Sequence, residues 1–137
     1  MLNYSALNFG KERQPQPLHD TTVSDTMSIN MRAEKTVYPV GTDFIPIIIS
    51  NNNEKELFFG SDYGIARKEG NKWIQLNTSS VWNSDGIIIK KGGEFRFHAS
   101  LYNLVNDNKA GIYKVFKKLG FDGSREEWYM SAEFELE

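Results

Sequence analysis

The stretch "AGIYKVFKKL", residues 110–119, decides the fold of this 137-residue chain. Gly111 permits a tight turn into a strand because glycine lacks a Cβ atom, and Tyr113 follows two residues later. We expect the hydroxyl of Tyr113 to return to a backbone group upstream and to pin a corner between two β-sheets. Val115 then fills a core position, and the stretch as a whole predicts a sandwich of two sheets.

The same strand offers candidates for a binding surface. Successive side chains of a strand point to opposite faces, so Lys114, Phe116 and Lys118 share a face that points away from the core. A face that combines lysines with an aromatic ring could bind an acidic or sugar ligand. The alternative is a solvated strand whose lysines discourage pairing at an edge.

Alternation of apolar and polar residues predicts three further strands, within residues 26–33, 94–101 and 128–136. The stretch "FIPIIIS", residues 44–50, is apolar at nearly every position, as expected for a strand that is covered on both faces. Pro46 cannot donate to a ladder. It therefore predicts an edge, a bulge or the first residues of a strand.

Turn signals separate these strands, and helix signals are nearly absent. Clusters rich in Gly, Asn and Asp occur at residues 41–43, 51–53, 69–71, 84–86 and 91–93. Such clusters favour hairpin loops, and we expect hairpins within residues 63–76 and 87–97. The pattern predicts an all-β fold, a two-sheet antiparallel sandwich of about seven to nine strands.

The first 25 residues lack the alternation of apolar and polar residues that marks the rest of the chain. Residues 1–25 predict an N-terminal arm or linker, with the segment Gln14–Pro17 at its centre and no sustained period, whereas residues 26–137 form the sandwich domain. The apolar exceptions in the arm, which suffice to dock a short piece of it on the domain, are Leu2, Tyr4, Leu7 and Phe9.

Composition excludes several classes of partner and site. The formal net charge is −2 and the pI is about 5.7, so no global positive field attracts nucleic acid. The absence of cysteine excludes a disulfide, a thiolate metal site and a cysteine nucleophile. No apolar run approaches the roughly 18 residues of a spanning helix. The first residues lack the order of a signal peptide, so either the protein is cytoplasmic or an export signal precedes this sequence.

The polar residues predict neither a catalytic site nor a cofactor. His19 and His98 lack further ligands at zinc spacing, and no Gly-x-Ser-x-Gly elbow occurs. The acids at 126–127 point apart, and Glu133 and Glu135 lie on the wet face of the last strand, so neither pair flanks a sugar. We expect a non-enzymatic protein.

Two loops rich in Asn and Asp, residues 83–85 and 106–108, leave one metal question open. Each could hold a weakly bound calcium ion through carbonyl and carboxylate oxygens. Neither has the regular acidic spacing of a helix-loop calcium site, and turn formation explains the same residues equally well.

The chain has more aromatic residues than its inward strand positions need. The surplus consists of Phe58, Phe59, Tyr63, Trp73, Trp82, Tyr102, Phe121 and Trp128. Aromatic side chains on a sandwich face commonly stack on sugars or anchor a protein partner. Trp73 is the expected core tryptophan, whereas Trp82 and Tyr102 fall near strand ends or loops and are the first candidates for an exposed patch.

The order of these segments resembles the bacterial immunoglobulin-like domains of uncharacterised exported proteins and lipoproteins. The resemblance covers about residues 27–136 and rests on Tyr38-Pro39, Asn51, Trp73, the segment from Gly92 to Phe97, Leu104, Gly111 and Tyr113. These motifs are loose structural ones. The resemblance implies an Ig-like sandwich that is often extracytoplasmic and without catalysis, and it transfers no binding site.

Two kinds of function are therefore expected. The first is a structural or adhesive module, anchored outside a bacterial cell through its arm, that recognises a protein or a glycan. The second is a small soluble binding or inhibitory protein that acts through an aromatic surface or adds a strand to a sheet edge. Homo-oligomerisation through an uncovered face is a third alternative.

Overall fold

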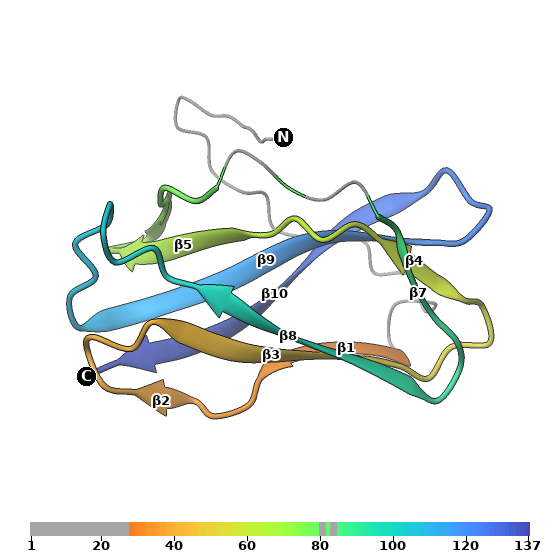
Figure 1. Cartoon of the computed structure of the whole chain (residues 1–137), viewed down its shortest axis with the longest axis horizontal. Coiled ribbons are helices and arrows are strands. Elements are labelled where there is room, and N and C mark those ends of the chain that lie inside the picture. Colours follow the sequence, from red (N-terminus) through yellow and green to blue (C-terminus); the bar gives the residue numbers. More distant parts are fainter. Residues whose placement is uncertain (1–27, 80–81, 83–84) are drawn as a thin grey trace.

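The computed structural model of the chain describes residues 28–79, 82 and 85–137. In this part of the chain two β-sheets pack against each other and no helix is present (Figure 1). The strands are β1 (Ile29–Ala33), β2 (Val37–Tyr38), β3 (Phe44–Asn51), β4 (Leu57–Phe59), β5 (Gly64–Glu69), β6 (Lys72–Gln75), β7 (Ile87–Ile89), β8 (Gly93–Ser100), β9 (Gly111–Phe121) and β10 (Glu127–Leu136). The all-β sandwich expected from the sequence is confirmed.

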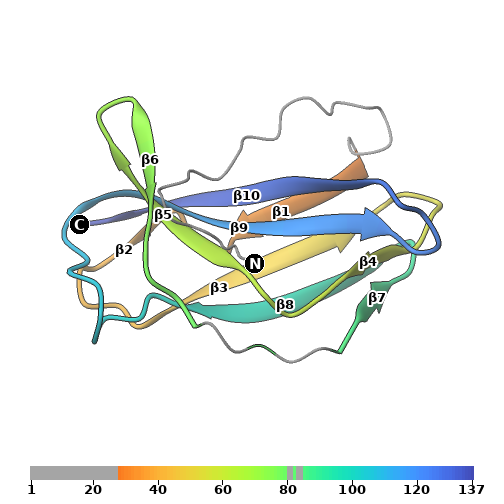
Figure 2. The same ribbon diagram turned by 90° about the horizontal axis from the view of Figure 1, so that it is seen from above.

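The smaller sheet has the order β1-β3-β8, and the larger sheet places β2, β10 and β9 side by side. The far edge of β9 is shared by β5 and β4, which pair in turn with β6 and β7. Seen from above, the β5–β6 hairpin projects from the body (Figure 2). Of the described strand pairs, only β2 with β10 is parallel. The described strands exceed the expected number because β2, β4 and β7 are too short to show a period.

Side chains from both sheets meet in one core. The largest fully buried hydrophobic side chains are Tyr113, Ile45, Ile47, Ile49, Leu57, Ile65, Leu101, Leu119, Leu136 and Val115. Burying one large apolar side chain contributes about 1.5–3 kcal/mol. The strands that alternation predicted supply this core from their expected faces, as Met31, Ala99 and Phe134 show for β1, β8 and β10.

The corner at the start of β9 is built around Tyr113. Its hydroxyl donates to the carbonyl of Lys109 at 2.6 Å, and its ring stacks on Phe134 with centroids 5.6 Å apart. Gly111 has a φ of +155°, a conformation that side chains with a Cβ rarely adopt. Val115 lies fully buried two residues after Tyr113. The corner therefore joins the loop between β8 and β9 to the core through one buried ring.

Strand β3 is central, and Pro46 does not mark an edge. It lies near the start of β3, between β1 on one side and β8 on the other. The carbonyl of Pro46 accepts a hydrogen bond from the amide of Glu34 at 2.9 Å, one residue beyond the end of β1. The missing N–H of the proline therefore falls where the ladder with β1 stops.

One predicted hairpin is formed and the other is not. β5 and β6 pair through the turn at Gly70, as expected. Strands β7 and β8 belong to different sheets, because β7 pairs with β4 and β8 pairs with β3. The prediction of a hairpin over residues 87–97 is therefore wrong. The chain crosses between the sheets at Gly92, whose amide donates to the carbonyl of Asn51 at 2.6 Å.

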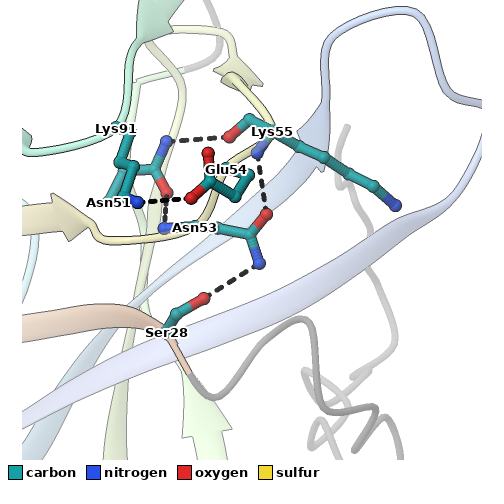
Figure 3. Close-up of polar contacts among 6 residues, drawn as sticks. All are labelled: Ser28, Asn51, Asn53, Glu54, Lys55 and Lys91. Carbon is teal, nitrogen blue, oxygen red and sulfur yellow. Dashed lines mark hydrogen bonds and ion pairs between the residues drawn. The ribbon is translucent and has the colours of Figure 1, made fainter.

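Asn51 holds this crossing in place (Figure 3). Its side chain is fully buried, and its Nδ2 donates to the carbonyls of Lys55 at 3.0 Å and of Ile89 at 2.7 Å. Its Oδ1 accepts from the amide of Asn53 at 2.8 Å. A buried amide group is stable only when its polar atoms are paired. One side chain thus joins the end of β3, the following loop and β7.

A second asparagine extends the junction toward β1. The Oδ1 of Asn53 accepts from the amide of Lys55 at 2.9 Å, and its Nδ2 donates to the hydroxyl of Ser28 at 2.9 Å. Lys91 forms an ion pair with Glu54 at the surface above it. These contacts are drawn in Figure 3 and explain structurally why an asparagine ends β3.

Candidate functional site

The outward face of β9 is covered. Lys114 and Phe116 are 7% and 4% exposed, so these two side chains do not form the open basic and aromatic face that alternation suggested. They do point away from the core as expected, but side chains of neighbouring strands lie over them.

Lys114 lies against Trp73, which extends from β6. The Nζ of Lys114 is 4.4 Å from the centroid of the indole ring, a cation–π contact. Burial lowers the pKa of the Lys114 amine, and Glu133, its cross-strand neighbour on β10, opposes that shift. Trp73 is half-buried and does not belong to the core cluster. The expectation that it is the core tryptophan is therefore corrected.

Phe116 occupies the space that a glycine leaves free. A Cβ atom at Gly64, its cross-strand partner on β5, would lie 2.2 Å from the phenyl ring. On the other side, the ring of Tyr129 lies with its centroid 6.2 Å away. Both neighbours fit the ring closely, which removes Phe116 from the set of accessible aromatic residues.

Of the outward residues Lys114, Phe116 and Lys118 of β9, only Lys118 is exposed to solvent. Its side chain is 48% exposed and its Nζ is 3.6 Å from a carboxylate oxygen of Glu127. It also lies 6.0 Å from the ring centroid of Tyr129. Exposed ion pairs of this kind contribute little to stability.

A bulge interrupts the far edge of β9. Phe58 pairs with Gly120 and Gly64 pairs with Phe116. Five residues, 59–63, therefore lie opposite three, 117–119. The extra residues cannot all join the ladder, so some of their backbone groups need other partners.

Lys117 supplies those partners from the inner face of β9. Its Nζ donates to the carbonyls of Gly60 at 2.8 Å and Asp62 at 2.6 Å. The ammonium group also lies 5.0 Å from the ring of Phe59 and 5.3 Å from that of Phe97. The residue is 2% exposed. Burial lowers its pKa to about 8, against an opposing contribution from Asp62.

The rings beside Lys117 belong to a longer series, which we call the aromatic row: Phe59, Phe95, Phe97, Tyr63 and Trp82. Successive centroids are 5.6, 5.9, 5.4 and 4.8 Å apart. The aromatic row lies along the side of the sandwich that is bordered by β8, the edge strand of the smaller sheet. All its members except Phe59 are only half-buried. The row is therefore an aromatic surface that solvent reaches in part.

Tyr63 brings together the two aromatic residues that were predicted as a patch. Its ring contacts Trp82, and its hydroxyl accepts from the amide of Ser100 at 2.8 Å. Burial raises the pKa of Tyr63; the bond from Ser100 lowers it and the hydroxyl of Tyr102 raises it further. Tyr63 is among the aromatic residues that exceed the inward strand positions. No pattern in the sequence predicted that it would contact both Trp82 and Tyr102.

The loop after β8 is held by asparagine side chains. Asn108 donates to the carbonyl of Leu101 at 2.8 Å, and Asn106 bonds to Asn77 through both its amide oxygen and its amide nitrogen. These contacts fix the loop that carries Tyr102, which has a positive φ of 50°. In the other candidate calcium loop, residues 83 and 84 lie outside the described part of the chain.

The remaining polar groups assemble no further site. His98 lies on the exposed face of β8, and His19 lies outside the described residues. No group of three or more histidine or acidic side chains suited to a metal occurs in the part of the chain that the structure describes. In that same part, no helix has the length and apolarity needed to cross a bilayer.

Comparison with known proteins agrees with this architecture. A family model described as a bacterial Ig-like domain matches residues 25–135, which is most of the chain. Comparison with curated proteins finds no significant match. The family is generally non-enzymatic. The matched region contains both sheets except for the last residue of β10, together with the corner at Tyr113 and the junction at Asn51. The chain therefore belongs to the family of bacterial Ig-like domains.

Proposed function

We propose that this domain is a non-catalytic recognition module that acts outside the bacterial cytoplasm and binds a protein or a glycan along the aromatic row. The observation that carries the proposal is the contact of half-buried Trp82 with Tyr63, beside Tyr102, at the accessible end of the row. An anchored module also fits a family whose members are often found at the cell surface.

The physical basis is the rigidity of these rings. Large aromatic side chains contribute contact area while few rotatable bonds are ordered on binding. Tyr63 is held by its ring contacts and by the amide of Ser100. A ligand that meets Trp82 therefore meets a surface whose neighbours are already positioned.

The second candidate is a soluble binding or inhibitory protein that uses the same surface. The observation that favours it is β8, which ends its sheet and pairs with β3 alone among the described strands. Fractionation of cells that express the full-length gene distinguishes the two, because only the first requires the protein to leave the cytoplasm.

A glycan array and a pull-down from host and bacterial surface extracts test the proposal. The variant Trp82→Ala, Tyr102→Ala should lose binding while keeping its thermal transition. Lys118→Ala is the matched control, because Lys118 lies on the outer face of the larger sheet, away from the row. Equal binding by wild type and the double variant, or no binding by wild type, would overturn the proposal.

A further inference from the structure

The open edge of β8 narrows the choice of ligand. A strand at the edge of a sheet presents backbone donors and acceptors that can pair with another chain. Within the described residues β8 pairs only with β3, from Phe44 opposite Ser100 to Asn51 opposite Gly93. It is also a long strand for an edge, with eight residues.

The pairing pattern identifies the groups on that edge. The amide of Leu101 donates to the carbonyl of Asp43, so the odd-numbered residues of β8 bond toward β3. The main-chain groups of Glu94, Arg96 and His98 therefore point away from β3. No hydrogen bond among the described residues engages those groups.

Tyr63 marks where this edge ends. Ser100 also points its amide outward, and that amide donates to the hydroxyl of Tyr63 at 2.8 Å. The open part of the edge therefore runs from Glu94 to His98. It offers three amides and three carbonyls in the regular spacing of a strand.

The side chains next to this edge are apolar on one face and charged on the other. Phe95 and Phe97 point inward and are half-buried, because no strand follows β8 to cover them. Glu94, Arg96 and His98 are exposed on the outer face. The guanidinium of Arg96 lies 3.3 Å from Glu34. An added strand would meet phenyl rings with one face and charges with the other.

We propose that the ligand is an extended polypeptide strand that pairs antiparallel with β8 from His98 to Glu94. This inference rests on the proposed recognition function and selects protein over glycan. Every second side chain of the strand is apolar and packs beside Phe95 and Phe97, in line with the aromatic row. The residue opposite Arg96 is acidic, because directly opposed charges of opposite sign stabilise a pair of strands.

A short peptide segment fits this edge better than a second copy of the domain. The hydroxyl of Tyr63 closes the edge at Ser100, and Trp82 packs beside it. A second copy would have to bring its own Tyr63 and Trp82 alongside the first. A single strand brings only its backbone and alternate side chains.

The probe is the blocked peptide acetyl-TVTVEVT-amide, with two methylated forms. One form carries N-methyl groups on the third, fifth and seventh residues, which are threonine, glutamate and threonine. The amides of these three residues would face β8. The other carries N-methyl groups on the three valines. Binding to the ¹⁵N-labelled full chain is followed by chemical shifts and amide hydrogen exchange, together with a glycan array.

The matched protein variants are His98→Pro and His98→Ala. The proline removes an outward amide that β3 does not use, whereas the alanine keeps that amide. We expect the unmethylated peptide to slow exchange at Glu94, Arg96 and His98, and His98→Pro to weaken binding by about tenfold. We expect His98→Ala to bind the unmethylated peptide with an affinity within about twofold of that of wild type. We also expect wild type to bind the valine-methylated peptide within about twofold of its affinity for the unmethylated peptide.

Four results would overturn the inference. These are equal binding by all three peptides, equal binding to wild type and His98→Pro, protection of other amides only, and concentration-dependent protection of β8 without peptide, which would identify a second copy. If glycans bind through Trp82 while the peptide does not, the proposed function stands and this inference fails. If neither a glycan nor any surface protein binds, the proposed function fails as well.

Discussion

Lys117 and Lys118 are adjacent on β9, yet the strand sends them to opposite faces. Lys117 is 2% exposed and its ammonium group bonds to two carbonyls between two phenyl rings. Lys118 is half-exposed and its ammonium group meets one carboxylate at the surface. The difference comes from the bulge at residues 59–63, which needs a long donor from the inner face of β9. The contribution of a lysine to the stability of this domain therefore depends more on its surroundings than on its charge.

Replacement of Lys117 by alanine should have the largest effect. Lys117→Ala leaves the carbonyls of Gly60 and Asp62 without their donor and opens a cavity between Phe59 and Phe97. We expect the free energy of unfolding to fall by about 3–5 kcal/mol. Lys118→Ala should change it by less than about 0.5 kcal/mol. Urea denaturation measures both, and equal losses would remove the contrast between the two faces.

The second prediction concerns pH. The pKa of Lys117 is lowered from 10.5 to about 8, so between these values the unfolded chain binds more protons than the folded one. Stability should therefore rise from pH 8 toward pH 10.5. We expect a gain of about 2–3 kcal/mol relative to Lys117→Met, which keeps the stem but has no charge. Parallel curves for the two proteins would show that Lys117 titrates normally.

The third prediction tests the outer face at Phe116. Gly64→Ala places a Cβ atom where the phenyl ring lies, and overpacking of this kind costs about 2 kcal/mol. The double variant Gly64→Ala, Phe116→Leu should recover part of that loss, because leucine vacates the ring's outer positions. Thermal unfolding of the two single variants and the double variant measures the coupling. Strictly additive effects would contradict the contact.

The smallest expected effect is at Trp73. Trp73→Ala exposes the Lys114 ammonium to water, so the pKa of Lys114 should move up toward its ordinary value. We expect stability to fall by about 1 kcal/mol, since the change also removes a cation–π contact. NMR titration of the Lys114 side chain checks the pKa. An unchanged pKa would mean that other neighbours keep water away from this amine.

The fold was predictable because its signals are local. The alternation in β1, β8 and β10 and the short spacing between Gly111 and Tyr113 can each be recognised within a few residues. The crossing at Gly92 was not predictable. The sequence Ile87–Ile89, two lysines and two glycines is the same whether the chain returns to its own sheet or changes sheets. Only the neighbours of β7 and β8 decide between these outcomes.

The candidate site was predictable only in part. Trp82 and Tyr102 were singled out by their positions near strand ends, and the structure brings both to Tyr63. The burial of Lys114 and Phe116 depends on Trp73 and on the missing side chain of Gly64, which are remote in sequence. The inward direction of Lys117 follows from counting two residues from Val115. The bulge that accommodates it has no sequence signal beyond an ordinary turn.

The junction at Asn51 has a consequence for the kinetics of folding. Its amide group joins β3 to Ile89, 38 residues later in the chain, and it does so inside the finished sandwich. Such a contact forms only after a long loop has closed, and folds that depend on distant pairings assemble slowly. Substitutions at Asn51 should therefore speed unfolding far more than they slow folding. The contacts of Asn51 therefore form late in folding and set the lifetime of the folded domain through its unfolding rate.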